Sequence, residues 1–309
     1  MSSGAVLVKR EVMQKTAPLA LSTRIKDGLN AVLKIAGLQV STTKLDRLEQ
    51  VRLEKLIAQK HWAAAPFEDG LCFEPDRYVN FLRTVCAPYA SDWGSFPRTA
   101  DAVGNGYFLQ NGWFESIDAE VLYSVIRHFR PRTILEIGSG HSSRLARRAI
   151  DDGQLGTTLV CVDPRPRVEV RSCADEHILS AVEELPVAAL TQRLGANDVL
   201  FIDSSHVIST GGDIPYLYLQ VVPRLSPGVL IHVHDIFLPF EYSQEFVVKE
   251  RWGWNEQYLL HALLIGNTGL EIVWPSCYMW QLYRAAVQNV ICSERSSPPP
   301  SSFWMLKKS

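Results

Sequence analysis

The sequence has 309 residues, of which 47% are hydrophobic and 21% are charged, and its formal net charge is −2. A chain of this length is long enough to bury one large core or two smaller ones. The charges nearly balance and are spread along the chain, which excludes the basic field that nucleic acids and anionic membranes require, so we expect neither partner.

Residues 1–112 predict helices and loops rather than a sheet. Apolar residues recur at helical spacing within residues 41–62, and "FEPDRYVNFLRTV" (73–85) predicts a second helix. Residues 87–112 are rich in Pro, Gly, Asn and Ser, which is typical of a loop. We therefore expect residues 1–112 to form a helical extension. Its helices would pack on the core, pair two copies of the chain in a homo-oligomer, or cover a substrate opening as a lid.

Residues 113–309 predict a separate α/β domain. After a helix in "ESIDAEVLYSVIRHF" (115–129), strands alternate with helices. The expected strands are "TILEIG" (133–138), "TTLVCVD" (157–163), "HILSAV" (177–182), "DVLFID" (198–203), "GVLIHVHD" (228–235), "LEIVW" (270–274) and "SFWMLKK" (302–308). Most are apolar throughout, as strands covered on both faces are, so we expect a doubly wound, largely parallel, Rossmann-like sheet.

The N-terminal sequence, the hydropathy and the cysteine spacing predict a cytoplasmic protein. No early apolar run precedes a small-residue cleavage site, and no window approaches the roughly 20 apolar residues of a transmembrane helix. The six cysteines include no C-x-x-C pair, which favours reduced thiols over a disulfide framework.

A glycine turn follows the first strand in "ILEIGSG" (134–140). Gly138 and Gly140, with Ser139 between them, let the backbone turn tightly and approach a ligand. Ser143 replaces the third glycine of the dinucleotide fingerprint, and Glu136 would place negative charge beside a pyrophosphate. The acidic turn therefore favours a cationic adenosyl ligand, S-adenosylmethionine, over a nicotinamide dinucleotide. Asp163 ends the second strand, where an acid can accept the ribose hydroxyls.

The segments "ILEIGSG", "CVD" (161–163) and "DVLFID" resemble motifs of class I S-adenosylmethionine-dependent methyltransferases, and the resemblance covers roughly residues 105–309. It implies a seven-stranded sheet of order 3-2-1-4-5-7-6 with strand 7 antiparallel. The cofactor contacts that it implies are Glu136, Gly138, Ser139 and Gly140 beside the methionine, Asp163 at the ribose, Glu183 near the adenine, and Asp203.

Acidic and histidine side chains gather after the fourth and fifth strands. Asp203 and His206 follow the fourth, and His234 and Asp235 end the fifth, at neighbouring tips of the expected sheet. Two functions fit. Asp203, His234 and Asp235 can hold a divalent metal that lowers the pKa of a hydroxyl. Alternatively, His206 or His234, oriented by Asp203, acts as a metal-free general base.

This cluster resembles that of metal-dependent O-methyltransferases of the catechol and macrolide-sugar types. Asp203 and Asp235 match their acids, His206 matches the base of an Asp-x-x-His arrangement, and His234 departs because an acid usually stands there. Mixed imidazole and carboxylate ligands favour manganese, iron or zinc over magnesium.

The connection after the fifth strand is rich in aromatic residues. Residues 236–254 contain Phe237, Phe240, Tyr242, Trp252 and Trp254. They would either line a pocket for a flat or partly apolar acceptor or seat the loop on the core. We expect methyl transfer from S-adenosylmethionine to a hydroxyl of a small molecule, such as a natural product or sugar. An N-methyltransferase, a nicotinamide-dependent oxidoreductase and a non-catalytic binding protein are the alternatives.

Overall fold

The structure, a computed structural model, describes residues 28–36, 44–100, 106–166, 172–292 and 299–308. The chain divides into two compact units, Met1–His61 and Trp62–Ser309. Residues 62–112 thus belong to the second unit together with the sheet, whereas the sequence predicts a boundary after residue 112. No helix among the described residues has the length and apolar character needed to cross a bilayer.

The first unit contains helix α2 (Lys44–Ala58) and a short 3-10 helix, Lys34–Ala36. The helix expected within residues 41–62 is therefore present. Its polar face carries an ion pair one turn apart between Arg52 and Glu49, 2.6 Å in length. Leu48 and Val51 are exposed on α2. Pairing of two chains through these helices stays a prediction.

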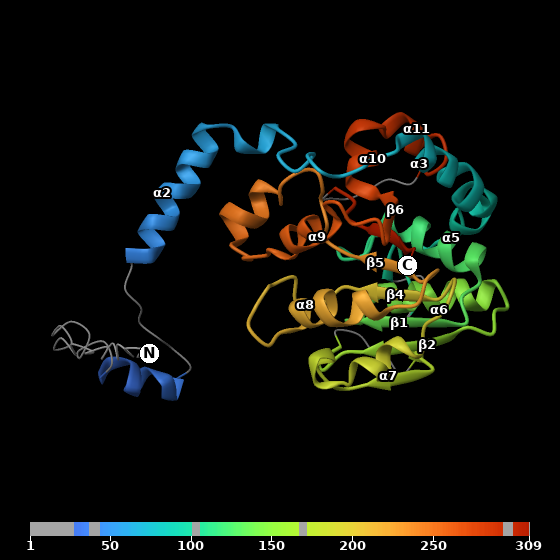
Figure 1. Cartoon of the computed structure of the whole chain (residues 1–309), viewed down its shortest axis with the longest axis horizontal. Coiled ribbons are helices and arrows are strands. Elements are labelled where there is room, and N and C mark those ends of the chain that lie inside the picture. The colour runs from blue at the N-terminus through green and yellow to red at the C-terminus, as the bar shows by residue number, and fades with distance from the viewer. Residues whose placement is uncertain (1–27, 37–43, 101–105, 167–171, 293–298, 309) are drawn as a thin grey trace, which may run out of the picture. The chain divides into compact units, whose positions relative to one another are not determined.

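The second unit is built on a seven-stranded sheet of order β3-β2-β1-β4-β5-β7-β6 (Figure 1). The strands are β1 (Thr133–Ile137), β2 (Thr158–Val162), β3 (Glu176–Ile178), β4 (Val199–Ile202), β5 (Leu230–Val233), β6 (Leu270–Pro275) and β7 (Phe303–Lys307). Strand β7 is antiparallel to both of its neighbours, β5 and β6, and the other pairs are parallel. The expected fold and the strand at the C-terminal end are confirmed.

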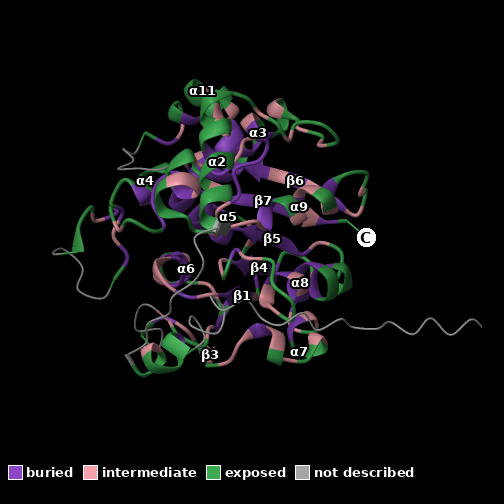
Figure 2. Cartoon of the chain, turned by 90° about the vertical axis from the view of Figure 1, so that its left-hand side faces the viewer, coloured by how far each residue is buried: buried purple, intermediate pink, exposed green. Residues whose placement is uncertain are grey.

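Helices cover both faces of this sheet. Figure 2 shows α6 on one side and α8 and α9 on the other, and α5 packs against α6. The helices are α3 (Pro75–Phe81), α4 (Ala90–Trp93), α5 (Asp118–Phe129), α6 (His141–Asp152), α7 (Val187–Thr191), α8 (Asp213–Tyr216), α9 (Glu256–Leu264), α10 (Ser276–Leu282) and α11 (Arg284–Gln288). Helix α8 continues as a π-helix over Leu217–Val221 and as a 3-10 helix over Val222–Arg224.

Burial follows the sequence pattern of the central strands. Leu135, Val160, Leu200 and Ile231 are almost completely buried because helices lie over both faces. Four of the six cysteines are also buried, and none of the six is paired in a disulfide in the described structure. The reduced state of the thiols stays a prediction.

Register fixes which strand ends meet. Ile137 of β1 pairs with Val162 of β2 on one side and with Ile202 of β4 on the other. Ile202 in turn pairs with Val233 of β5. The residues that follow these four strands therefore emerge side by side at one edge of the sheet, where open α/β folds bind ligands.

Candidate active site

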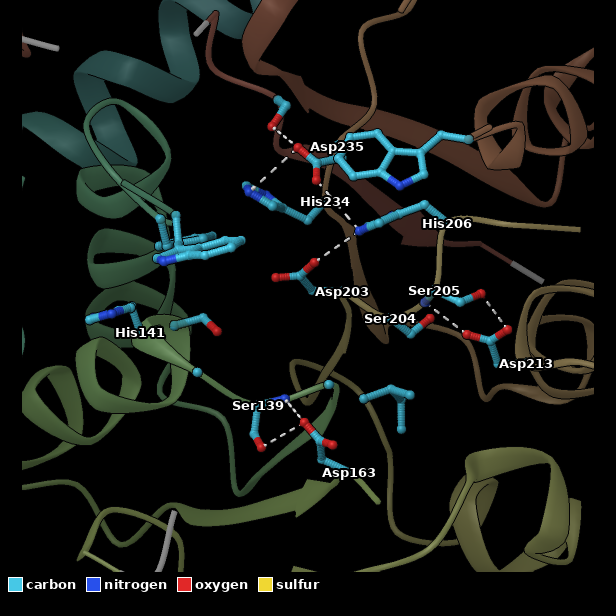
Figure 3. Close-up of a pocket in the computed structure, with 18 of the residues that line it drawn as sticks. Ser139, His141, Asp163, Asp203, Ser204, Ser205, His206, Asp213, His234 and Asp235 are labelled. Atoms are coloured by element: carbon cyan, nitrogen blue, oxygen red, sulfur yellow. Dashed lines mark hydrogen bonds and ion pairs between the residues drawn. The ribbon is translucent and has the colours of Figure 1, made fainter. Parts of the chain in front are cut away.

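A cavity of about 1080 Å³ lies at this edge. Its lining includes nearly all of the sequence-predicted site residues: Gly138, Ser139, Gly140, Asp163, Glu183, Asp203, His206, His234 and Asp235. Figure 3 shows them in two groups, with Ser139 and Asp163 on one side and Asp203, His206, His234 and Asp235 on the other. The volume is that of a site for a drug-sized ligand or a cofactor with a small acceptor.

Gly138 and Gly140 of the turn are glycines for different physical reasons. Gly138 has φ +82°, and a Cβ there would lie 1.8 Å from the carbonyl oxygen of Asp203. Glycine is therefore required by the close approach of the ends of β1 and β4. Gly140, which precedes α6, has no atom within 4 Å of an added Cβ. Its missing side chain leaves space in the cavity.

Asp163 holds the glycine turn from the tip of β2. One carboxylate oxygen accepts hydrogen bonds from the Ser139 backbone N–H at 2.8 Å and from its hydroxyl at 3.1 Å. The other accepts the Arg165 backbone N–H at 2.6 Å. A carboxylate with two oxygens has lone pairs beyond these three bonds, so Asp163 can also accept hydroxyl groups from a ligand in the cavity.

Glu136 does not belong to the cavity lining in the described part of the chain. Its carboxylate points into the protein, where it accepts the Ser142 hydroxyl at 2.5 Å and lies 3.3 Å from the Cys161 thiol. Burial raises the pKa of Glu136 to about 7, against opposing hydrogen bonds from Ser142, Ser143 and Cys161. The structure therefore places this acid beneath the turn, with no direct contact to the cavity.

His206 lies at the centre of the second group. Its Nε2 is 3.3 Å from Asp203 Oδ1 and 3.4 Å from Asp235 Oδ2, while its Nδ1 is 2.9 Å from Glu256 Oε2. Asp203, His206 and Asp235 each direct one ligand atom into a region 4.8 Å across. This set includes His206 and omits His234, unlike the ligand set that the sequence predicts.

Electrostatics within this group are strong because it is buried. Burial opposes charge on Asp203, but His234 and His206 hold the pKa of Asp203 well below its usual range. Burial likewise opposes charge on His206, yet Asp203 and Glu256 raise the pKa of His206 well above its ordinary value.

Asp235 is supported by residues far away in the sequence. Ser301 donates its hydroxyl to Asp235 at 2.9 Å. The backbone N–H groups of Ser301 and Ser302 donate in turn to Asp118, at the start of α5, at 2.9 and 3.1 Å. The segment before β7 is thus fixed by a buried carboxylate, and it fixes the Asp235 side chain.

The two histidines of β5 differ in their surroundings. His232 is fully buried, stacks on Phe201 and lies 2.9 Å from the Ser302 hydroxyl through Nε2. It is a core residue. His234 lines the cavity, and its Nε2 is 4.0 Å from Asp235.

The aromatic connection divides between packing and lining. Phe237 and Tyr242 are buried with Phe246 in a separate apolar cluster, which seats the loop. Trp252 and Trp254 line the cavity, and Trp252 stacks on Phe246 with a centroid distance of 4.3 Å. Phe237 and Tyr242 thus seat the loop on the core, whereas Trp252 and Trp254 face the cavity; that these two rings bind a flat acceptor stays a prediction.

Sequence reasoning missed several residues of this site. They are Glu256, Ser301, Asp118 and the pair Ser205–Asp213, in which Asp213 accepts the Ser205 hydroxyl at 2.6 Å. Glu256 and Asp118 stand in the first turns of helices, where acids are ordinarily solvent-facing. The one signal was composition, because Glu256 precedes a run of mostly apolar residues.

Comparison with known proteins places the site in context. Residues 135–236 match the model of a family described as a methyltransferase domain. An uncharacterized protein of Archaeoglobus fulgidus is 50% identical over 40 residues, which are 13% of this chain and 18% of that protein. The alignment thus spans under a fifth of that relative.

Solved structures with a similar fold include two methyltransferases with bound SAH (S-adenosylhomocysteine). That of Podospora anserina is 15% identical, with a TM-score of 0.42 and coverage of 88% of this chain and 98% of that one. The O-methyltransferase of Bacillus cereus is 15% identical, with a TM-score of 0.40 and coverage of 74% and 100%. The matched residues make up about a third of the chain, and the observed strand order agrees with the class I methyltransferase fold that the sequence predicts.

Proposed function

We propose that this protein transfers the methyl group of S-adenosylmethionine to a hydroxyl group of a neutral small molecule, with a divalent cation in the Asp203, His206 and Asp235 group. The observation that carries the proposal is the position of this group, which faces the glycine turn across one cavity (Figure 3). Asp163 on the turn side would accept the ribose hydroxyls, and the acceptor would lie between the two groups.

The donor set fits a cation. Two carboxylates and one imidazole supply atoms within 4.8 Å of one another, and this mixed set suits manganese, iron or zinc better than magnesium. When bound, such an ion lowers the pKa of a coordinated hydroxyl. The raised pKa of His206 argues against this histidine as the general base, because it favours the protonated ring.

Of the two histidines in the group after β4 and β5, His234 has the weaker contacts with carboxylates. His206 has carboxylates on both ring nitrogens at 2.9 to 3.4 Å, whereas the His234 Nε2 approaches one carboxylate at 4.0 Å. We assign acceptance of the hydroxyl proton to His234. The acceptor oxygen then attacks the sulfonium methyl in line, a C–O bond forms as the C–S bond breaks, and S-adenosylhomocysteine leaves.

The lining limits the acceptor. Seven acids line the cavity, namely Glu115, Asp118, Asp163, Glu183, Asp203, Asp213 and Asp235, and Arg165 is the one Lys or Arg among the described lining residues. This charge disfavours phosphorylated or carboxylated acceptors. The rings of Trp252 and Trp254 favour a planar ring or the CH face of a sugar.

The test combines binding and turnover. SAH should bind in calorimetry while NAD does not, and Mn²⁺ should bind the same protein. Labelled methyl should pass to neutral aromatic diols or glycosides in preference to their phosphorylated counterparts, and Asp203→Ala and His234→Gln should lower kcat at least about 100-fold. Tight binding of NAD without SAH would replace the proposal with an oxidoreductase. Transfer to amines instead of hydroxyls would make the protein an N-methyltransferase.

A further inference from the structure

We infer that Glu256, at the start of α9, is a positioning residue that aims the Nε2 atom of His206 at the cation site. The inference rests on the proposed function, because it assigns a role toward the cation proposed there. Glu256 lies 50 residues after His206 in the sequence and does not line the cavity in the described structure.

Both oxygens of the Glu256 carboxylate are engaged and none of its surface is exposed. Oε2 lies 2.9 Å from His206 Nδ1, and Oε1 accepts the hydroxyl of Tyr218 at 2.8 Å. A fully buried carboxylate is costly unless it is paired and hydrogen-bonded. The histidine supplies one hydrogen bond through its Nδ1 and the tyrosine supplies the second.

The backbone of His206 is held by the same helix turn. Its carbonyl oxygen accepts the N–H groups of Asn255 at 3.0 Å and Glu256 at 3.2 Å. The Asn255 side chain accepts a hydrogen bond from the backbone N–H of Ile208, two residues after the histidine, at 2.5 Å. His206 has a φ of +58°, which non-glycine residues rarely adopt and which persists where surrounding contacts fix it.

These contacts set the direction of the ring. Because Nδ1 is held against Glu256, Nε2 is directed between Asp203 Oδ1 and Asp235 Oδ2, at 3.3 and 3.4 Å. An imidazole that donates its Nδ1–H to a carboxylate presents its Nε2 lone pair to a cation, and the carboxylate makes the ring a stronger ligand. Glu256 thus does for His206 what Ser301 does for Asp235.

Titration of the full-length protein with Mn²⁺, followed by calorimetry and by loss of the free-ion EPR signal, tests the role. Glu256→Gln keeps the shape and removes the charge, so we expect Mn²⁺ affinity to fall about 10- to 100-fold while SAH affinity stays within threefold. Glu256→Asp keeps the charge and shortens the side chain, so its loss should be smaller. Tyr218→Phe removes the other hydrogen bond of the same carboxylate and serves as the matched control, with an expected change below about threefold.

The outcomes separate the inference from the function on which it rests. Mn²⁺ affinity in Glu256→Gln within twofold of wild type would overturn the positioning role and leave the cation site intact. If that variant does not fold, unchanged affinity in Glu256→Asp overturns it equally. A wild-type protein that binds SAH but no Mn²⁺ overturns the cation site itself, and the role of Glu256 toward a cation with it.

Discussion

The two walls of the cavity are held in different ways. On the wall formed by β1 and β2, the contacts are short in sequence, since Asp163 binds Ser139, 24 residues earlier, and Arg165, two residues later. On the wall formed by β4 and β5, His206 depends on Glu256, 50 residues away, and Asp235 on Ser301, 66 residues away. The first wall is a local turn, and the second is assembled by the tertiary fold.

The largest loss of stability is expected for a substitution at Gly138, where the two walls are in contact. Gly138→Ala would place a Cβ 1.8 Å from the Asp203 carbonyl at a φ of +82°, and clash and strain together should cost about 4 kcal/mol of unfolding free energy. Urea unfolding measures this. Gly140→Ala is the matched control, because its Cβ meets no atom within 4 Å. It should keep the stability and weaken SAH binding, and equal losses of stability in both variants would contradict this account.

The difference between the walls also explains which features of the site the sequence predicts and which it does not. Alternating apolar strands and helices, the glycine turn and Asp163 are local signals, and the structure has them in the expected places. The order of the strands follows from the resemblance to class I methyltransferases, and the structure has that order too. The inward direction of Glu136 depends on its contact with Ser142 on α6. The roles of Glu256, Asp118 and Ser301 arise from contacts across 50 to 183 residues, which no local pattern specifies. Likewise, residues 62–112 join the unit of the sheet through tertiary packing.

Beneath the first wall, Glu136 makes stability depend on pH. Its pKa is raised to about 7 from 4.5, so the folded state retains a proton that the unfolded state loses above pH 4.5. The stabilising contribution is therefore complete below pH 4.5 and is lost as the pH rises through 7, by about 3 kcal/mol in total. Glu136→Gln should remove this loss.

Urea unfolding of wild type and Glu136→Gln at pH 5 to 8.5 measures the effect of that buried acid. The stability of the variant relative to wild type should rise with pH and level off above pH 8. Glu183→Gln, on the surface of the cavity, is the control and should leave the pH dependence unchanged. A constant difference between wild type and Glu136→Gln across this range would show that Glu136 ionises normally.

Substitutions on the two walls should differ in their effect on cofactor affinity. Asp163→Ala removes a charged acceptor that we expect to bind the ribose, so SAH affinity should fall by about 1–3 kcal/mol. Asp203→Ala should leave SAH affinity within a few-fold while it abolishes turnover. Calorimetric titration of both variants measures the contrast. Unchanged affinity in Asp163→Ala would contradict the ribose role, and activity in Asp203→Ala would show that the second wall is not catalytic.

The smallest expected effect concerns the acceptor side of the second wall. Trp252 is 43% exposed and stacks on Phe246 at 4.3 Å, so Trp252→Ala should change the unfolding free energy little. It should raise KM for an aromatic or sugar acceptor roughly fivefold, because one face of the acceptor loses a ring contact that is worth about 1 kcal/mol of binding free energy. Trp252→Phe keeps a ring and should restore most of the affinity. Since Phe237 and Tyr242 seat the loop from below, a loss of stability in Trp252→Ala equal to that in Phe237→Ala would mean that both rings serve packing alone.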